Sequence, residues 1–314
     1  MKVYLLRRVL AVIPVMIVVA TVTFVLLHLA PGDPASVMAG PDATEHDVAK
    51  IRRLLGLDEL LPVQLVRWYS RLLVGDLGTS IFLRQPVLEA IVDRLEPTLL
   101  LALWGLLIAV LIGIPTGVVS ARYRNTVVDQ SCMGLALVGL SIPNFLLGLL
   151  MILFFGVWLG WLPVAGYVPL ERGLWANLRS LIMPAVSLGL VQSALIARIT
   201  RSSMLDVLRE QYILAGRAKG LSEPNVIYKH ALRNAIIPTL TVIGISFAVI
   251  LGGAVVVENV FNIPGLGRLI YSAVLRRDYP VIQGVVLLVA VKYTLVNLVV
   301  DLAYIAIDPR IRYR

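Results

Sequence analysis

Six long apolar runs constrain this chain more than any other feature of its sequence. The hydrocarbon core of a bilayer is about 30 Å thick, so a helix rising about 1.5 Å per residue needs about 20 apolar residues to cross it. Predominantly apolar runs of this length occupy residues 9–29, 98–120, 131–160, 181–199, 236–257 and 281–307. Hydrophobic residues make up 59% of the chain, against about 45–50% in soluble domains. We therefore predict an all-α polytopic membrane protein with six transmembrane helices.

Lysine and arginine gather beside alternate ends of these runs, which predicts the orientation of the chain. Short cytoplasmic loops carry the excess of these residues, whereas long exported segments are largely exempt. Fifteen lie in the N-terminal tail, after the second run, between residues 198 and 233 and at the C-terminus, against five in the other short loops. Both termini are therefore predicted to be cytoplasmic. The same loops account for the net charge of +9, so we expect contact with membrane lipid and none with nucleic acid.

This orientation divides the chain into three parts. Residues 1–29 form a tail and the first span, residues 30–97 an external insert, and residues 98–314 a five-helix core with a cytoplasmic loop at 201–235. The first run has a second interpretation, as the core of a signal peptide, because Lys2, Arg7 and Arg8 precede it. We retain it as a span because its apolar stretch exceeds the roughly 7 to 15 residues of such a core.

The external insert carries the signals of folded helices. Thr44 and Asp47 have the spacing of a capping box that opens a helix, and Gly56 is placed to end it. A second amphipathic helix is predicted from Pro62 to Val74. Two interpretations fit this insert: a small cap lying on the bilayer surface, and a docking platform for an external partner.

The most polar cytoplasmic stretch, residues 197–238, predicts a helix, a glycine break and a second helix. Met204, Leu205, Leu208 and Tyr212 fall at helical spacing. Gly216 and Gly220 lie four residues apart, which predicts a bare strip where another backbone approaches closely. Ser222 is a suitable N-cap for a short second helix.

This stretch resembles the cytoplasmic signature loop of importer-type ABC permeases, whose pattern is E-A-A, three residues, then G. Here YILAGRAKGLSEPNVIYKHALRNAIIP has Leu214 at the Glu position, Ala215 and Gly216 at the two Ala positions, and Gly220 at the Gly. Further matching segments are RRVLAVIPV, HLAPGDP, GDLGTSI, IPGLGRL, RRDYPVIQG, NLVVDLAY and DPRIRYR. Together they resemble the first permease subunit of dipeptide, oligopeptide, glutathione and nickel importers.

The resemblance implies a type I ABC importer permease fold in the inner membrane. It implies that this loop sits in a groove of a cytoplasmic ATPase. Closure of the nucleotide sites would then be transmitted through the loop to the transmembrane helices. The residues so assigned are Tyr212, Leu214, Ala215, Gly216, Arg217, Lys219, Gly220 and Leu221. The implied partners are a second homologous permease, two ABC ATPases and an extracytoplasmic substrate-binding protein. The implied cargo is short peptides, with glutathione or nickel as the alternative.

The sequence itself contains no P-loop for ATP and no recognisable cofactor site. The P-loop pattern G-x-x-x-x-G-K-[ST] is missing, and the dipeptide Gly-Lys does not occur. A single cysteine, Cys132, and three scattered histidines make no metal-ligand cluster. We therefore expect a transport subunit that is not an enzyme and holds no cofactor, with ATP hydrolysed by its partners.

Polar residues inside the runs are candidates for a translocation path, because such residues usually face a cavity or a partner. They are Asn144, beside Pro143, Gln192 with Ser193, and Lys292. For the first three, ordinary hydrogen bonding between spans is the alternative. For Lys292 the alternative is a tilted placement that lets the side chain reach lipid headgroups.

Three functions of other classes compete with the permease hypothesis. A proton-coupled secondary transporter needs acidic or histidine relays within its spans, and Lys292 and Asp301 are the ionisable residues there. A membrane enzyme needs clustered Asp, His, Ser or Cys near one membrane face, which the sequence lacks. A passive scaffold fits the sequence too, and transport by reconstituted vesicles discriminates it from a permease.

Overall fold

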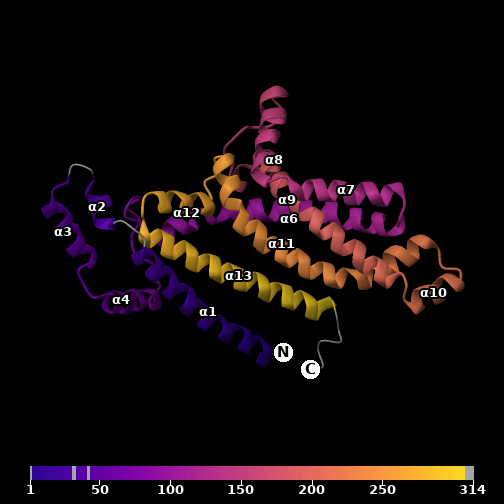
Figure 1. The fold of residues 1–314 in the computed structure, drawn as a ribbon, viewed down its shortest axis with the longest axis horizontal. Coiled ribbons are helices and arrows are strands. Elements are labelled where there is room, and N and C mark those ends of the chain that lie inside the picture. Colours follow the sequence, from indigo (N-terminus) through magenta and orange to yellow (C-terminus); the bar gives the residue numbers. More distant parts are fainter. Residues whose placement is uncertain (1, 30–32, 41–42, 308–314) are drawn as a thin grey trace. The chain divides into compact units, whose positions relative to one another are not determined.

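The chain is mainly helical in the part that its computed structural model describes, residues 2–29, 33–40 and 43–307 (Figure 1). These helices group into two compact units. One comprises Met1–Glu96 with Gly265–Leu295, and the other comprises Pro97–Pro264 with Val296–Arg314. The terminal motif DPRIRYR, with the arginines counted for orientation, lies outside the described residues, as does the side chain of Asp301.

Four helices are long and apolar enough to cross a bilayer, and each covers or overlaps one of the predicted runs. They are Val87–Arg122 (α5, Val87–Val92, and α6, Leu95–Arg122), Leu174–Val207 (α9), Asn225–Val260 (η3, Asn225–Ala231, and α11, Leu232–Val260) and Tyr279–Val296, the first part of α13 (Tyr279–Ile307). Over the first run the chain forms α1 (Lys2–Leu29), whose part Ile13–Leu29 is a shorter apolar helix.

The remaining run, residues 131–160, is interrupted as Pro143 predicts, and the interruption is a sharp bend. Helix α7 (Val127–Ser141) meets α8 (Asn144–Met151) and the π-helix η1 (Ile152–Trp158) at 96°. Ile142 takes extended backbone angles, φ −88° and ψ 122°, because a residue before proline is disfavoured in the helical region. The pair is either a broken span or a re-entrant loop, so the count of crossing helices is four, or five if the pair crosses, among the described residues.

Small residues on α6 let α9 approach it closely in the second unit. A Cβ added at Gly113 would lie 2.8 Å from the Ile196 side chain, and one added at Gly117 would lie 2.6 Å from the Ala197 carbonyl oxygen. Helices gain no hydrophobic free energy by associating within lipid, so close van der Waals contacts of this kind hold them together. Around this seam lies a core from α6, α9 and α11 that includes Leu101, Leu181, Met183, Ile250 and Phe261. The short 3-10 helix η2 (Leu170–Arg172) precedes α9.

The predicted helices of the insert are present in the first unit. Helix α3 (Glu45–Leu55) begins at the expected capping box, in which Thr44 and Asp47 bond each other's backbone, and Gly56 ends it in the left-handed conformation. The hydrogen bonds from Thr44 lower the pKa of Asp47. Helix α4 spans Leu61–Leu73, one residue earlier than predicted at each end. A further helix, α2 (Pro34–Ala39), has Asp33 as its N-cap.

One buried carboxylate joins two segments of this unit that are far apart in sequence. Asp278 precedes α13 and follows α12 (Leu266–Leu275). Its side chain accepts hydrogen bonds from Ser80 Oγ at 2.5 Å, Ile81 N at 3.2 Å and Phe82 N at 3.1 Å. The guanidinium of Arg276 stacks 3.3 Å from the centre of the Phe82 ring. The loop after α4 is thereby fixed against the start of α13.

Candidate functional site

The segment between α9 and α11, residues 208–222, forms a short helix held between two long ones; we call it the α10 segment. Helix α9 ends at Val207, α10 spans Gln211–Ala218, and η3 then leads directly into α11. The predicted succession of helix, glycine break and helix is confirmed. Two details differ: a turn at residues 208–210 separates Tyr212 from the helix of Met204, and the second helix is the start of α11 and not a separate short element.

The two glycines of this segment do not form the bare strip that their spacing predicts. Helix α10 ends at Ala218, so Gly220 lies beyond it with a φ of +83°, a conformation that side chains other than glycine rarely adopt. Gly216 is inside α10, but Leu221 folds back over it, and a Cβ added there would lie 3.1 Å from Leu221 Cδ1. The glycines therefore shape the end of α10 and the turn after it.

Three contacts hold α10 in place. Ile213 is 1% exposed and packs into a cluster with Val118 of α6, Met204 of α9 and Val226 of η3. The hydroxyl of Tyr212 accepts a hydrogen bond from Asn234 Nδ2 at 2.6 Å. Arg217 forms a two-point ion pair with Glu223, at 2.8 and 3.3 Å. Because an isolated helix of eight residues is unstable in water, these contacts are what keeps α10 folded.

Ile213 is the residue of this segment that the sequence analysis missed. It stands between two residues that the family pattern selects, Tyr212 and Leu214, and the pattern carries no sign that it faces inward. The available signal was helical periodicity, since a short helix that packs against the rest of a protein is expected to bury about one apolar residue in each turn.

The other side of the α10 segment is exposed and mostly small or apolar. Leu214 is 53% exposed and Leu221 40% exposed, and Ala215 and Lys219 are also exposed. An exposed apolar face on a fixed helix is suited to contact with another protein. Of the predicted residues, Leu214, Ala215, Lys219 and Leu221 therefore lie on the open side, while Tyr212 and Arg217 are bonded within the chain.

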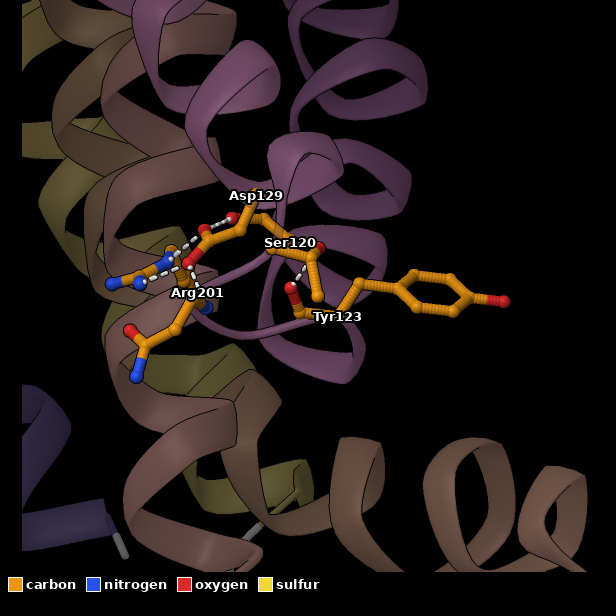
Figure 2. Close-up of polar contacts among 6 residues, drawn as sticks. Ser120, Tyr123, Asp129 and Arg201 are labelled. Atoms are coloured by element: carbon orange, nitrogen blue, oxygen red, sulfur yellow. Dashed lines mark hydrogen bonds and ion pairs between the residues drawn. The ribbon is translucent and has the colours of Figure 1, made fainter.

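A buried ion pair fixes the end of α9 from which this segment departs (Figure 2). Asp129, 4% exposed, accepts from Arg201 Nε and Nη2, both at 2.7 Å. Its carboxylate also accepts from the Ser120 hydroxyl and from Asn125 N, the latter at 2.9 Å. The carboxylate thus joins the α6–α7 turn to α9 six residues before that helix ends. The sequence analysis missed this site, although a lone acid at the edge of an apolar run was the signal available for it.

The residues predicted for a translocation path lie on three different helices. Asn144 begins α8, half-buried, with its side-chain oxygen accepting from Phe145 N at 2.9 Å. Ser193 is buried on α9 and donates to Leu190 O at 2.7 Å within its own helix, and Gln192 beside it is half-buried. Lys292, on α13, belongs to the other unit and is half-buried. Their part in transport stays a prediction. No group of three His, Cys, Asp or Glu residues suited to a metal occurs in the described residues.

Comparison with known proteins places the whole chain in one family. Residues 113–313 match the model of the binding-protein-dependent transport system inner membrane component, and residues 1–102 match the N-terminal model of such membrane components. The chain belongs to this family of ABC importer permeases and is a multi-pass protein of the inner membrane. Family members of this kind are permease subunits and are not themselves the ATPase.

Two relatives align with the chain over nearly its full length. It is 49% identical, over 100% of both chains, to the probable peptide ABC transporter permease protein y4tP of Sinorhizobium fredii. It is 47% identical, over 99% of both chains, to the glutathione transport system permease protein GsiC of Salmonella paratyphi A. Among solved structures, it resembles a chain of the inward-facing MetNI methionine ABC transporter, with a TM-score of 0.59 and 21% identity over 70% of this chain and 97% of that one. This last likeness supports the fold.

Proposed function

We propose that this permease forms half of the translocation pathway of a short-peptide importer and receives the energy of ATP through the outer face of α10. The observation that carries the proposal is the construction of the α10 segment. One side of the helix is anchored by Ile213, and the opposite side presents Leu214 and Ala215 to solvent. A partner that moves this helix must therefore also move the helices to which Ile213 is packed.

The contacts of the α10 segment connect it rigidly to the long helices around it. Ile213 lies in one cluster with residues of α6, α9 and α11. The pair between Asp129 and Arg201 adds a polar link between the α6–α7 turn and α9. Closely packed elements transmit displacement because interiors resist compression. A shift of α10 by an ATPase groove would therefore reach three long helices together.

The proposed topology has six spans and both termini in the cytoplasm, with residues 30–97 outside. The α10 segment is then cytoplasmic, on the side of the ATP. The proposed complex contains this chain, a second homologous permease, two ABC ATPases and an extracytoplasmic binding protein. The excess of Lys and Arg in the loops assigned to the cytoplasm supports this orientation.

Short peptides are the proposed cargo, with glutathione as the second candidate. The relatives named for peptide and for glutathione transport are similarly close to this chain, at 49% and 47% identity, and glutathione is itself a tripeptide. Uptake of a labelled dipeptide by the reconstituted complex, in competition with unlabelled glutathione, decides between them. Preference for glutathione over the dipeptide would replace the first assignment with the second.

The coupling proposal is tested by filling the open face of α10. Ala215→Trp adds a large ring at an exposed position, so the fold of the permease is expected to persist while the ATPase no longer docks. The matched control is Gln130→Trp, at an exposed position of α7 outside the α10 segment. We expect ATPase co-purification and ATP-driven uptake to be lost with Ala215→Trp and kept with Gln130→Trp. If Ala215→Trp retained both ATPase co-purification and ATP-driven uptake, the proposed docking surface would be refuted.

A further inference from the structure

The first unit contains a cavity that the coupling site does not use. It has a volume of about 340 Å³, at the lower end of the range for small-molecule pockets, about 300 to 1,000 Å³. Its walls come from α1, α4, the loop after α4 and the first turns of α13. Aromatic rings form much of its surface, with Phe24 stacked on Trp68 at 5.7 Å and His28 tilted toward Tyr279 at 6.5 Å.

Several polar groups of the cavity are already bonded within the chain. His28 Nδ1 lies 2.8 Å from Phe24 O, and its Nε2 lies 3.1 Å from Gln64 Oε1. Gln64 Nε2 donates to Leu57 O and Glu59 O. These bonds fix the wall formed by α1 and α4, and they leave the two side chains little capacity for a ligand.

Two deeply buried polar side chains on the opposite wall have no such bonds. Tyr279 and Gln283 are each 8% exposed, lie one helical turn apart on α13, and line the cavity. Neither the Tyr279 hydroxyl nor the Gln283 amide has a hydrogen-bond partner among the described residues. The indole N–H of Trp68 is likewise unbonded there. The Trp68 side chain is half-buried, and all three residues line the cavity. Polar groups that line a cavity and have no partner in the chain are available to orient a ligand there.

The charges around the cavity are of both signs. Arg71, at the C-terminal end of α4, forms no ion pair within the described part of the chain. Asp76 lies just beyond it and accepts from Gly78 N with one carboxylate oxygen, which leaves the other oxygen available. Both residues line the cavity. A ligand with a carboxylate at one end and an ammonium at the other matches this pair, and an apolar side chain matches the walls of Phe24 and Leu77.

From these observations we infer that the cavity binds a short zwitterionic peptide with an apolar or aromatic side chain. Arg71 and Trp68 hold its carboxylate, Asp76 its ammonium, and Gln283 and Tyr279 its peptide amide. Under the proposed topology the cavity lies on the external side, so it is a receiving site before translocation. The inference thus rests on the proposed function for its place in transport, while the binding chemistry is independent of it.

The test is calorimetric titration of the full chain in phosphatidylcholine nanodiscs with leucyl-phenylalanine. Amidating its carboxylate or acetylating its amine is expected to weaken binding at least tenfold. Tyr279→Phe removes only the hydroxyl and is expected to weaken binding about fivefold, and Gln283→Leu about tenfold. Tyr271→Phe, at an exposed tyrosine of α12 outside the cavity, is the matched control and is expected to bind as the native chain does.

The inference fails if leucyl-phenylalanine does not bind, if the amidated and acetylated peptides bind equally well, or if Tyr279→Phe has no effect. It also fails if phosphatidylglycerol in the nanodisc displaces the peptide, because the cavity then holds a lipid headgroup. Uptake by the complete complex separates this result from the proposed function. Normal ATP-driven uptake without binding in the cavity refutes the receiving site alone, whereas binding without ATP-driven uptake refutes the importer proposal.

Discussion

Replacing Ile213 by alanine is expected to release α10 from the rest of the permease. The substitution removes three carbon atoms from a side chain that is 1% exposed. At about 0.8 kcal/mol per buried methylene group, the transfer free energy lost is about 2.4 kcal/mol, and the cavity left behind brings the cost to about 3 kcal/mol. Because each 1.4 kcal/mol is a factor of ten, local opening of the α10 segment should become about a hundredfold more frequent.

Hydrogen exchange of the purified permease measures this opening directly. Protection of the amides of residues 211–218 should fall about a hundredfold in Ile213→Ala, while the middle of α9 keeps its protection. Leu214→Ala is the matched control, since Leu214 is 53% exposed and surface substitutions usually change stability by at most about 0.5 kcal/mol. Equal protection in Ile213→Ala and the native chain, or equal loss in both variants, would refute the assignment of Ile213 as the anchor.

Three further substitutions probe the rest of the fold. Asp129→Ala leaves the guanidinium of Arg201 without its carboxylate, and should cost about 3 kcal/mol, seen as a lower melting temperature of the detergent-purified chain. Gly113→Leu, where an added Cβ meets α9 at 2.8 Å, should reduce the yield of folded protein, whereas Gly134→Leu, in open space, should not. Thr44→Ala removes the cap of α3 and should cost about 1 kcal/mol, measured as faster exchange of the amides at the start of α3 with no change in the second unit.

Local signals in the sequence predicted local structure well. The capping box at Thr44 and the proline at position 62 gave α3 and α4 within one residue, because these caps depend on residues only three or four apart. Pro143 predicted the interruption of the third apolar run for the same reason. The bend of 96° was beyond prediction, since its size depends on what the two halves pack against.

The contacts that build the site join residues far apart in the chain, and the sequence analysis missed them. Asp129 and Arg201 are separated by 72 positions, and no local pattern pairs them. The prediction of a glycine strip is wrong for a related reason. It placed Gly216 and Gly220 on one helix, but the helix ends between them. The family pattern selected the right segment of the chain and not the side of the helix on which each residue lies.

The most direct test of energy coupling through α10 is cysteine cross-linking in the assembled complex. In a Cys132→Ser background, a cysteine placed by Leu214→Cys lies on the open face of α10, and one placed by Val66→Cys lies on α4 of the insert, where Val66 is 69% exposed. We expect Leu214→Cys to cross-link to the ATPase and Val66→Cys to give no such product. A cross-link to the ATPase from Val66→Cys, or none from Leu214→Cys, would contradict the account.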